Sequence, residues 1–397
     1  MTICIAGQSN IAIDVCEYIL QTYKGATILA IINRNDNSKN RIQRSFSLYL
    51  EQKKVIKCVD LDYVYQIKDL IFLSLEFDRI INPKLFISKR LYNIHFSKLP
   101  EYKGMYTASL PILHMKQQSG VTLHCIDSGI DTGDIIAQRV YEMSENETAE
   151  SLYLKNIEYG TDLVIENIDA IINQNYLAYS QDSKSSSYYS KKAIDYHNLT
   201  IELNCTAAQL DAQIRAYHFR QFQLPSVYQY QIVYTSILKE KSLQKSGTIL
   251  EDNKSFIKLA TIDYDIVLYK DRLLELMNYC QNNNLSSLCR VNNLKYFINL
   301  KEKKFGWTLL MVAAYNNSYE VAEYLINQGA NVNLINYNGT TPLMYAKDGA
   351  LKSGDTRLLD LLLRFGADKN VKDFFGKNIL QYTKEQSIEL YNHIKSF

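Results

Sequence analysis

Short apolar runs alternate with segments of helical periodicity along residues 1–190. Helical patterns cover residues 8–23, with a cap expected at Ser9 or Asn10, and residues 148–174. The apolar runs that we interpret as strands, one of them with the loop that follows it, are 2–7, 26–34, 69–86, 90–97, 120–127 and 134–141. Strands that alternate with helices predict an α/β fold with a Rossmann-like, mostly parallel sheet in a domain of residues 1–190.

A polar, serine-rich run at residues 180–192 marks the first domain boundary. Beyond it, residues 206–218 have a helical pattern, whereas residues 226–238 and 255–269 are rich in tyrosine and in other residues that favour strands. We therefore expect a small α+β middle domain, mixed in its secondary structure, over residues 191–275.

The last third of the chain contains a repeat. Residues 305–333 align with residues 338–370, with Gly306 matching Gly339 at the 33-residue period of ankyrin units, and a third unit begins at Gly376 after four extra residues. Residues 271–300 lack the signature but have a helical pattern suited to the first, capping unit of a stack. We expect an all-α ankyrin domain over residues 276–397.

The net charge and the cysteines indicate which partners and which cellular compartment to expect. The 44 basic and 42 acidic residues leave a formal net charge of +2, so nucleic-acid partners are disfavoured. Seven scattered cysteines fit a reducing, cytoplasmic compartment rather than a disulfide scaffold or a zinc ribbon. No apolar run approaches the length of about 18 residues that a membrane span needs, so we expect neither secretion nor a membrane span.

Two polar side chains share one face of a predicted strand. Asn93 and His95 are two residues apart and project from the same side of an extended chain. Asp131 follows in a glycine-rich loop between two later strands, where α/β folds place their sites. An amide donor, an imidazole and a carboxylate suit acyl transfer to an amine, because they can stabilise an oxyanion and carry a proton without a serine or cysteine nucleophile.

Three motifs around these residues resemble the 10-formyltetrahydrofolate-dependent formyltransferase family. They are N-x-H-x-S-x-L-P-x-Y-K-G at Asn93 to Gly104, G-V-T-L-H at Gly120 to His124, and D-x-G-D-I-I from Asp131. The resemblance covers roughly residues 1–275. It is strongest to enzymes that N-formylate dTDP-linked amino sugars and carry a C-terminal ankyrin segment, a subset that handles 3-amino-3,6-dideoxyhexoses for the O-antigen of lipopolysaccharide and is expected to form homodimers.

The resemblance also implies roles for individual residues, and it implies no metal. Asn93, His95 and Asp131 match the catalytic residues, and His124 would hold the active-site loop or support Asp131. The residues expected beside the folate are Phe77, Asp78, Ile80, Ile81, Ile126, Asp127, Gly129 and Asp131. The residues expected beside the dTDP-amino sugar are Gly7, Gln8, Ser9, Asn10, Tyr102, Lys103, Gly104 and Tyr106.

Trp307 is the only tryptophan and precedes Thr308 in a predicted ankyrin finger, where side chains point outward. We hypothesise that Trp307 stacks on a nucleotide base and so marks a second nucleotide-sugar site. The alternative is that its ring packs against the preceding domain.

Several functions share these motifs and stay open on sequence alone. The acceptor could be a 4-amino sugar or another amine, including initiator methionyl-tRNA or glycinamide ribonucleotide, or the reaction could be hydrolysis of the formyl folate. A different class is an ankyrin protein-binding module on an inactive scaffold. The sequence also leaves a gluco or a galacto configuration of the sugar open.

Overall fold

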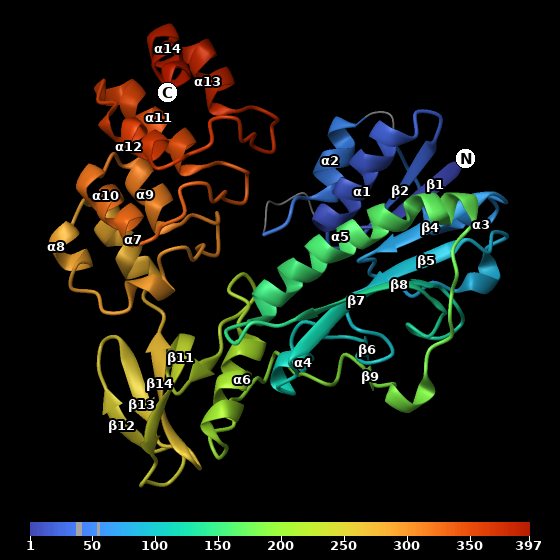
Figure 1. Ribbon diagram of the computed structural model, residues 1–397, viewed down its shortest axis with the longest axis horizontal. Helices are drawn as coiled ribbons and strands as arrows, with labels where there is room; N and C mark the ends of the chain where they lie inside the picture. Colours follow the sequence, from blue (N-terminus) through green and yellow to red (C-terminus); the bar gives the residue numbers. More distant parts are fainter. Residues whose placement is uncertain (37–41, 54–55) are drawn as a thin grey trace. The chain divides into compact units, whose positions relative to one another are not determined.

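The computed structural model describes residues 1–36, 42–53 and 56–397. The chain forms two compact units, one made mainly of residues 1–268 and the other mainly of residues 269–397. Figure 1 shows the first unit in blue, green and yellow and the second in orange to red.

A seven-stranded sheet forms the core of the first unit (Figure 1). Its strands, in chain order, are β1 Thr2–Gly7, β2 Thr27–Ile32, β3 Lys57–Cys58, β4 Leu70–Leu75, β5 Leu91–His95, β7 Gln118–Cys125 and β8 Ile135–Glu142. Their order across the sheet is β3-β2-β1-β4-β5-β7-β8. The neighbours from β3 to β5 pair in parallel, whereas β7 is antiparallel to both β5 and β8. The predicted Rossmann-like, mostly parallel sheet is therefore confirmed.

Apolar side chains cover both faces of this sheet. Helices α1 Ser9–Thr22 and α5 Ala149–Asn173 share a buried cluster with alternate residues of the central strands, such as Leu73 and Ile94. On the opposite face, Phe72 and Leu91 belong to a second cluster. The other short elements of this part of the unit are α2 Phe46–Gln52, α3 Leu61–Tyr65, η1 Pro83–Leu85, β6 Lys103–Gly104 and α4 Leu110–Leu113.

The two helix starts differ in how well the sequence predicted them. Thr148 caps α5 with a reciprocal bond to Ser151, as expected for a helix over 148–174. Gln8, and not Ser9 or Asn10, occupies the N-cap position of α1. The cap prediction is wrong because the hydroxyl of Ser9 donates instead to the carboxylate of Glu76.

The strand order reverses between β1 and β4. From β1 the chain continues to β2 on one side, and β4 pairs with β1 on the other side. A crevice forms at the carboxyl ends of the strands at such a switch point, and α/β proteins bind ligands there. The ends of β1, β4 and β5 are therefore the expected place for a site.

The segment after α5 returns to the first sheet domain before the middle region begins. It contains η2 Ser183–Ser185 and β9 Tyr188–Tyr189, which pairs with β6. Helix α6 Ala207–Tyr217 confirms the helical pattern at 206–218. A five-stranded sheet follows, made of β10 Ser226–Val227, β11 Tyr230–Lys241, β12 Ile249–Asp252, β13 Phe256–Leu259 and β14 Tyr264–Lys270. The strand predicted at 226–238 forms β10 and β11, which are separated at Tyr228, where a φ of 53° turns the chain. The strand predicted at 255–269 likewise forms two strands, β13 and β14.

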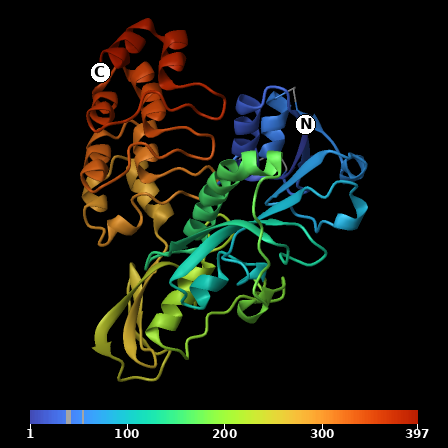
Figure 2. The ribbon, with the colours of Figure 1, turned by 45° about the vertical axis from the view of Figure 1, so that its right-hand side comes forward.

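The second unit consists of stacked helix pairs, with the loops between them projecting to one side (Figure 2). The helices are α7 Leu273–Gln281, α8 Leu285–Leu288, η3 Leu294–Tyr296, α9 Leu309–Tyr315, α10 Tyr319–Asn327, α11 Pro342–Ser353, α12 Arg357–Arg364, α13 Ile379–Gln386 and α14 Ile388–Ser396. Gly306, Gly339 and Gly376 all have positive φ, which matches the repeat period read from them. The four extra residues lengthen α11 to 12 residues, against 7 in α9.

Candidate active site

Strand β5 presents Asn93 and His95 on the face opposite α5. The intervening Tyr92 and Ile94 pack into the cluster with α1 and α5, so the strand period of two turns Asn93 and His95 the other way. His95 is only 8% exposed. The burial of Tyr92 and Ile94 therefore fixes the direction in which Asn93 and His95 point.

The loop between β7 and β8 brings Asp131 to the same place. Asp131 has a left-handed φ of 55°, and its backbone oxygen accepts a hydrogen bond of 2.9 Å from the amide of Gln181. Gln181 also bonds the oxygen of Gly133 at 2.8 Å. A side chain at Gly133 would place its Cβ 1.8 Å from the carbonyl oxygen of Cys125, so only glycine fits. The loop is thus held on both sides of Asp131.

The three side chains form one contact network. Oδ2 of Asp131 lies 3.4 Å from Nδ1 of His95 and accepts a 2.9 Å hydrogen bond from the backbone amide of Gly104. Oδ1 of Asp131 lies 3.4 Å from Nδ2 of Asn93. The structure therefore brings together the three residues that the sequence singled out for chemistry.

The hydrogen bonds assign the hydrogen on the His95 ring. Nε2 of His95 lies 2.8 Å from the carbonyl oxygen of Tyr102, which can only accept, so Nε2 carries the hydrogen. Nδ1 of the neutral ring then points a lone pair toward Asp131. Two acceptors side by side are suited to receive a proton from a third group.

Burial and charge set the protonation states. Burial lowers the pKa of His95 below its ordinary value, and the nearby Asp131 carboxylate offsets only part of this effect. Burial alone raises the pKa of Asp131, but the interactions with His95, His124 and the Gly104 amide outweigh it and lower the pKa to about 2. At neutral pH the pair is therefore a neutral imidazole beside a carboxylate.

His124 orients the amide of Asn93. Its Nδ1 lies 2.8 Å from the carbonyl oxygen of Cys125 and so carries the hydrogen, which leaves Nε2 as an acceptor 3.0 Å from Nδ2 of Asn93. The same Nε2 is 3.6 Å from Oδ1 of Asp131. His124 is 2% exposed. His124 therefore holds Asn93 and contacts Asp131 from a buried position.

The loops expected beside the folate lie next to each other. Phe77 and Ile126 pack on the same buried cluster, and Ile81 is part of it. Ile80 is 80% exposed and Ile130 is 38% exposed, which leaves apolar surface on both loops. Asp78 accepts a 2.9 Å bond from the amide of Arg34.

Asp127 stabilises the second of these loops. Its Oδ1 accepts hydrogen bonds from the amide of Gly129 at 3.1 Å and from the hydroxyl of Thr132 at 2.6 Å. A Cβ at Gly129 would lie 2.0 Å from the Thr132 hydroxyl. These residues therefore shape the loop through its own hydrogen bonds.

The turn from Gly7 to Asn10 places a carboxylate next to the backbone amides at the start of α1. Ser9, with a φ of 63°, donates through its hydroxyl to Oε2 of Glu76 at 2.6 Å. A carboxylate of the protein thus already lies at the start of α1, which disfavours a phosphate there and favours sugar hydroxyls.

The expected substrate residues after β5 have different surroundings. Tyr102 is 5% exposed, stacks on Tyr189 with ring centroids 5.6 Å apart and bonds His114 through its hydroxyl, so its ring is part of the core. Tyr106 donates to the carbonyl oxygen of Lys191. Lys103 is 8% exposed, and its charge acts on His95.

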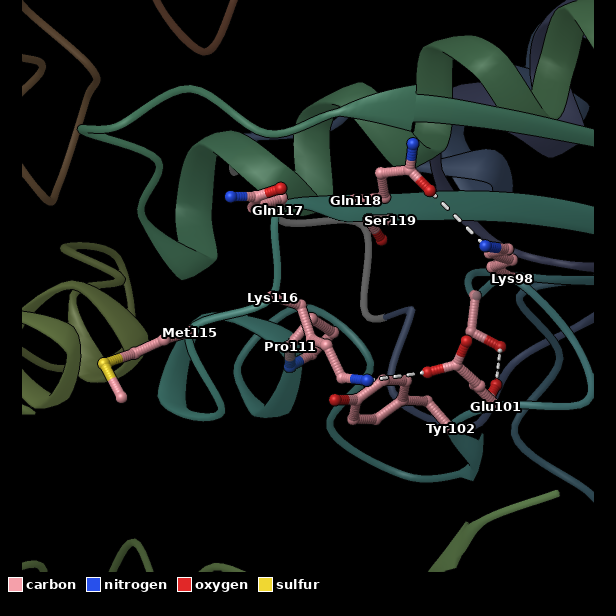
Figure 3. A pocket seen from close by; sticks show the side chains of 10 residues that line it. Lys98, Glu101, Tyr102, Pro111, Met115, Lys116, Gln117, Gln118 and Ser119 are labelled. Carbon is pink, nitrogen blue, oxygen red and sulfur yellow. Dashed lines mark hydrogen bonds and ion pairs between the residues drawn. The ribbon is translucent and has the colours of Figure 1, made fainter. Parts of the chain in front are cut away.

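A pocket of about 470 Å³ lies beside this segment, between β7 and α4 (Figure 3). Lys98 reaches Gln118 across its rim, and Lys116 is 3.1 Å from the carboxylate of Glu101. Of the expected substrate residues only Tyr102 lines it. The pocket therefore lies near the end of β5 without including Asn93, His95 or Asp131.

Trp307 belongs to an aromatic cluster of the ankyrin unit. Its ring centroid is 4.8 Å from that of Tyr345, 5.2 Å from that of Tyr315 and 6.5 Å from that of Phe305. Phe305 is 51% exposed and Tyr315 is 42% exposed. Nζ of Lys352 lies 5.6 Å from the Tyr315 ring centroid. An open aromatic surface with a cation beside it is thus present at this finger.

Metal clusters and membrane-spanning helices are both absent from the part of the chain that the structure describes. No cluster of three or more histidine, cysteine, aspartate or glutamate side chains is suited to hold a metal ion. None of the described helices has the length and apolarity needed to cross a bilayer.

Two site residues had no signal in the sequence. Gln181 lies in the serine-rich run that we interpreted as a linker, and Glu76 lies inside an apolar strand-and-loop segment. Their partners are 50 and 67 residues away in the chain. Only the folded arrangement reveals them.

Comparisons with known proteins agree with this geometry. A profile of the formyl transferase family matches residues 63–168, and a profile of three ankyrin repeats matches residues 276–373. The crystal structure of WlaRD, a sugar 3N-formyl transferase, in the presence of dTDP and 5-N-formyl-THF is 38% identical, with a TM-score of 0.63, and covers 68% of this chain and 98% of that one. The chain belongs to the sugar N-formyltransferases.

Other similar proteins are formyltransferases as well. An N-formyltransferase from Helicobacter canadensis in complex with folinic acid and dTDP-3-aminofucose is also 38% identical, with a TM-score of 0.63, covering 68% of this chain and 99% of that one. The methionyl-tRNA formyltransferase of Clostridioides difficile is 26% identical over 293 residues, which are 66% of this chain and 89% of that protein. The predicted enzyme class is thereby confirmed, and this sugar N-formyltransferase carries ankyrin repeats in addition.

Proposed function

We propose that this sugar N-formyltransferase moves the formyl group of 10-formyltetrahydrofolate onto the amine of a dTDP-linked 3-amino-3,6-dideoxyhexose. The observation that carries this proposal is the 38% identity to two enzymes over nearly their whole length, one described as a sugar 3N-formyl transferase and the other bound to dTDP-3-aminofucose. Both structures contain a formylated folate, which supports the donor.

The pair of His95 and Asp131 receives the proton of the attacking amine. The folate donor supplies the formyl carbon. Because Nδ1 of His95 and Oδ2 of Asp131 are acceptors 3.4 Å apart, an amine held between them becomes more nucleophilic as its N–H hydrogens point at both. The proton taken by His95 then lies on Nδ1, from which it can be passed to the departing nitrogen.

Asn93 stabilises the oxyanion with one of its two amide hydrogens. Nδ2 donates to His124 at 3.0 Å, and the second hydrogen is held only at 3.4 Å by Asp131. A bond of that length is weak, so this second hydrogen is available to a developing negative charge that lies along its direction. Asn93 thus donates to the oxyanion while His124 keeps the amide in place.

Residues of two loops fit a flat folate ring. Ile80 and Ile130 leave apolar surface exposed on the loops that contain Asp78 and Asp127, and exposed apolar side chains are suited to cover a heteroaromatic ring. The backbone groups of these loops would supply the specific hydrogen bonds.

Lys103 is the best-placed cation for the diphosphate of the substrate. It directly precedes Gly104, whose amide bonds Asp131, and no ion pair joins it to a carboxylate of the described residues. A buried ammonium without a carboxylate partner favours an anionic ligand. The Glu76 carboxylate disfavours a phosphate at the Ser9 turn. We therefore expect the diphosphate of the substrate near Lys103 and its sugar near Ser9.

The competing reactions are less well supported. The net charge of +2 does not favour tRNA, and an idle scaffold has no physical need for a buried carboxylate beside two histidines. Formyl-folate hydrolysis uses the same triad, and a 4-amino sugar the same loops, so both need a direct test.

The test mixes purified protein with 10-formyltetrahydrofolate and a panel of dTDP-amino sugars, with products identified by mass. We expect one formyl group on the 3-amino sugars, and none with His95→Ala. Folate turnover without a formylated sugar would show a hydrolase, and no turnover would favour the binding-module alternative.

We also propose that the aromatic cluster around Trp307 is a second nucleotide-sugar site. The exposed rings of Phe305 and Tyr315 and the nearby ammonium of Lys352 support it, because a base can stack on the rings while the cation faces a phosphate.

We propose further that the enzyme is a cytoplasmic homodimer whose product is used for O-antigen lipopolysaccharide. Seven free cysteines support a reducing compartment. Exposed Ile237 on β11 and Ile249 and Leu250 on β12 support a surface that a second copy could cover.

A further inference from the structure

The segment that follows α5 returns to the catalytic residues. Residues 179–189 pair with the first sheet domain at both ends, first with Ile135 and then through β9 with β6 (Figure 1). A Cβ at Gly104 would lie 2.3 Å from the carbonyl oxygen of Tyr189, so the segment passes too close for any residue but glycine there. This segment is therefore packed beside the site, although its serine-rich sequence resembles a linker.

Ser187 holds the turn that follows the catalytic strand. Its hydroxyl oxygen accepts a 2.8 Å hydrogen bond from the backbone amide of Tyr102, and its carbonyl oxygen accepts a 2.9 Å bond from the amide of Lys103. Its own amide donates to the carbonyl oxygen of Pro100 at 3.1 Å. Tyr102 has a left-handed φ of 58°, which is uncommon and costly for residues other than glycine. Three hydrogen bonds from one residue therefore hold this backbone conformation in place.

One peptide unit, between Tyr102 and Lys103, joins Ser187 to the His95 ring. Its N–H donates to the carbonyl oxygen of Ser187, and its own carbonyl oxygen lies 2.8 Å from Nε2 of His95. A peptide unit is planar, so fixing the direction of its N–H also fixes the direction of its carbonyl oxygen. The two hydrogen bonds polarise the same peptide and strengthen each other. Ser187 therefore determines where the acceptor for the His95 hydrogen lies.

Both ring nitrogens of His95 face an acceptor, so the ring hydrogen has two possible places. Asp131 lies 3.4 Å from Nδ1, and a carboxylate attracts a hydrogen more strongly than a neutral carbonyl oxygen does. The shorter 2.8 Å contact at Nε2 opposes this attraction only while the carbonyl oxygen of Tyr102 stays in place. With the hydrogen on Nδ1, the ring could no longer receive a proton on the side of Asp131. The position of one backbone oxygen therefore decides whether the ring can act as a base.

We propose that Ser187 is a positioning residue that keeps the hydrogen of His95 on Nε2 by holding the peptide that follows Tyr102. The inference rests on the proposed function, in which Nδ1 takes up the proton of the amine. Gln181 of the same segment bonds the backbone of Asp131, so both members of the catalytic pair depend on this segment. The backbone bonds of Ser187 remain in any variant, and its hydroxyl is the part that a substitution can test.

The test follows the ring nitrogens of His95 directly. In protein with isotopically labelled histidine, the NMR shifts of the ring nitrogens distinguish a nitrogen that carries a hydrogen from one that does not, and His95→Asn identifies the His95 signals. At neutral pH we expect a hydrogen on Nε2 alone in the wild type and a mixture of both positions in Ser187→Ala. Ser187→Thr, which keeps the hydroxyl, should restore the wild-type signals. Ser186→Ala removes an exposed hydroxyl next to it and, as the matched control, should leave the signals unchanged.

Kinetics provide a second readout. We expect Ser187→Ala to lower kcat by about two- to tenfold, the range of one neutral hydrogen bond, with little change in the KM of either substrate. Burial lowers the pKa of His95, and the hydrogen bond at Nε2 offsets part of this effect, so weakening that bond should move the acidic limb of kcat/KM to lower pH. Asp131, His124 and Lys103 also act on this pKa, and the variant leaves all three in place.

The outcomes separate this inference from the function beneath it. Ring-nitrogen signals of Ser187→Ala that equal those of the wild type would overturn the role of Ser187, whether or not kcat falls. A wild type with the His95 hydrogen on Nδ1 would overturn it as well. A wild type that formylates no amino sugar would overturn the proposed function, and the ring-nitrogen signals would still decide the inference.

Discussion

Nδ1 of His95 lies 3.4 Å from Oδ2 of Asp131 with a lone pair, not a hydrogen, pointed at the carboxylate. Nδ1 and the carboxylate are both proton acceptors, and an attacking amine can donate a proton to them. The same two residues therefore explain why the site needs no protein nucleophile, and why its activity should depend on the protonation of one imidazole.

Replacing either residue should stop the chemistry without preventing binding. We expect His95→Asn and Asp131→Asn to lower kcat by about 100- to 10,000-fold, because each removes the group that takes up the proton. The KM for both substrates should change little. Steady-state kinetics with formylated sugar as the readout checks this, and a large rise in KM at unchanged kcat would show a binding role instead.

The pH profile should follow His95. The pKa of His95 lies below the ordinary value of 6.5, so Nδ1 can accept a proton at neutral pH. This ability is lost as the pH falls through the lowered pKa, because the ring is then already protonated. We expect kcat/KM to fall on the acidic side, together with protonation of the substrate amine. Asp131→Asn removes the carboxylate that raises the pKa of His95, so the remaining activity should have its acidic limb at lower pH. A profile that stays flat down to about pH 5 would contradict this mechanism.

Glycine at position 133 should be required for the Asp131 loop. Gly133→Ala places a Cβ 1.8 Å from the oxygen of Cys125, so the loop has to move and kcat should fall sharply. Gly25→Ala is the matched control, because no atom lies within 4 Å of the added Cβ, and its activity should equal that of the wild type. Equal activity of both variants would show that the loop position does not matter.

His124 should affect the rate through Asn93 and Asp131 rather than by contact with the reacting atoms. Because one hydrogen bond to Nδ2 is lost, we expect His124→Phe to lower kcat by about two- to tenfold, which corresponds to a single neutral hydrogen bond of ~0.5–1.5 kcal/mol. His124→Gln, which can offer a carbonyl acceptor, should recover part of the loss. A decrease as large as that of His95→Asn would instead place His124 in direct contact with the reacting atoms.

Local patterns predicted the parts of this site that depend on local geometry. The two-residue spacing of Asn93 and His95 fixes their common face, since side chains alternate along any strand. The 33-residue spacing of Gly306 and Gly339 likewise predicted the ankyrin fingers, because each turn needs a positive φ at that position.

The contacts that complete the site come from distant parts of the chain. Gln181 holds Asp131 across 50 residues, and Ser9 holds Glu76 across 67, and neither pair has a local signature. Tyr102 shows the opposite case. Its motif suggests a ring beside the nucleotide, but stacking on Tyr189, from a segment that resembles a linker, buries it.

Trp307 offers a direct optical test of the second site, because it is the only tryptophan in the chain. Stacking of a thymine base on its ring should change the fluorescence, so we expect a saturable change when dTDP is added to the intact protein. Calorimetry should count two dTDP per chain in the wild type and one in Trp307→Ala. Tyr345, whose ring lies 4.8 Å from the indole, provides the second variant, and Tyr345→Ala should weaken the fluorescence response without removing the probe. An unchanged signal at saturating dTDP, with one binding event in both proteins, would show that the ring only packs within the ankyrin unit.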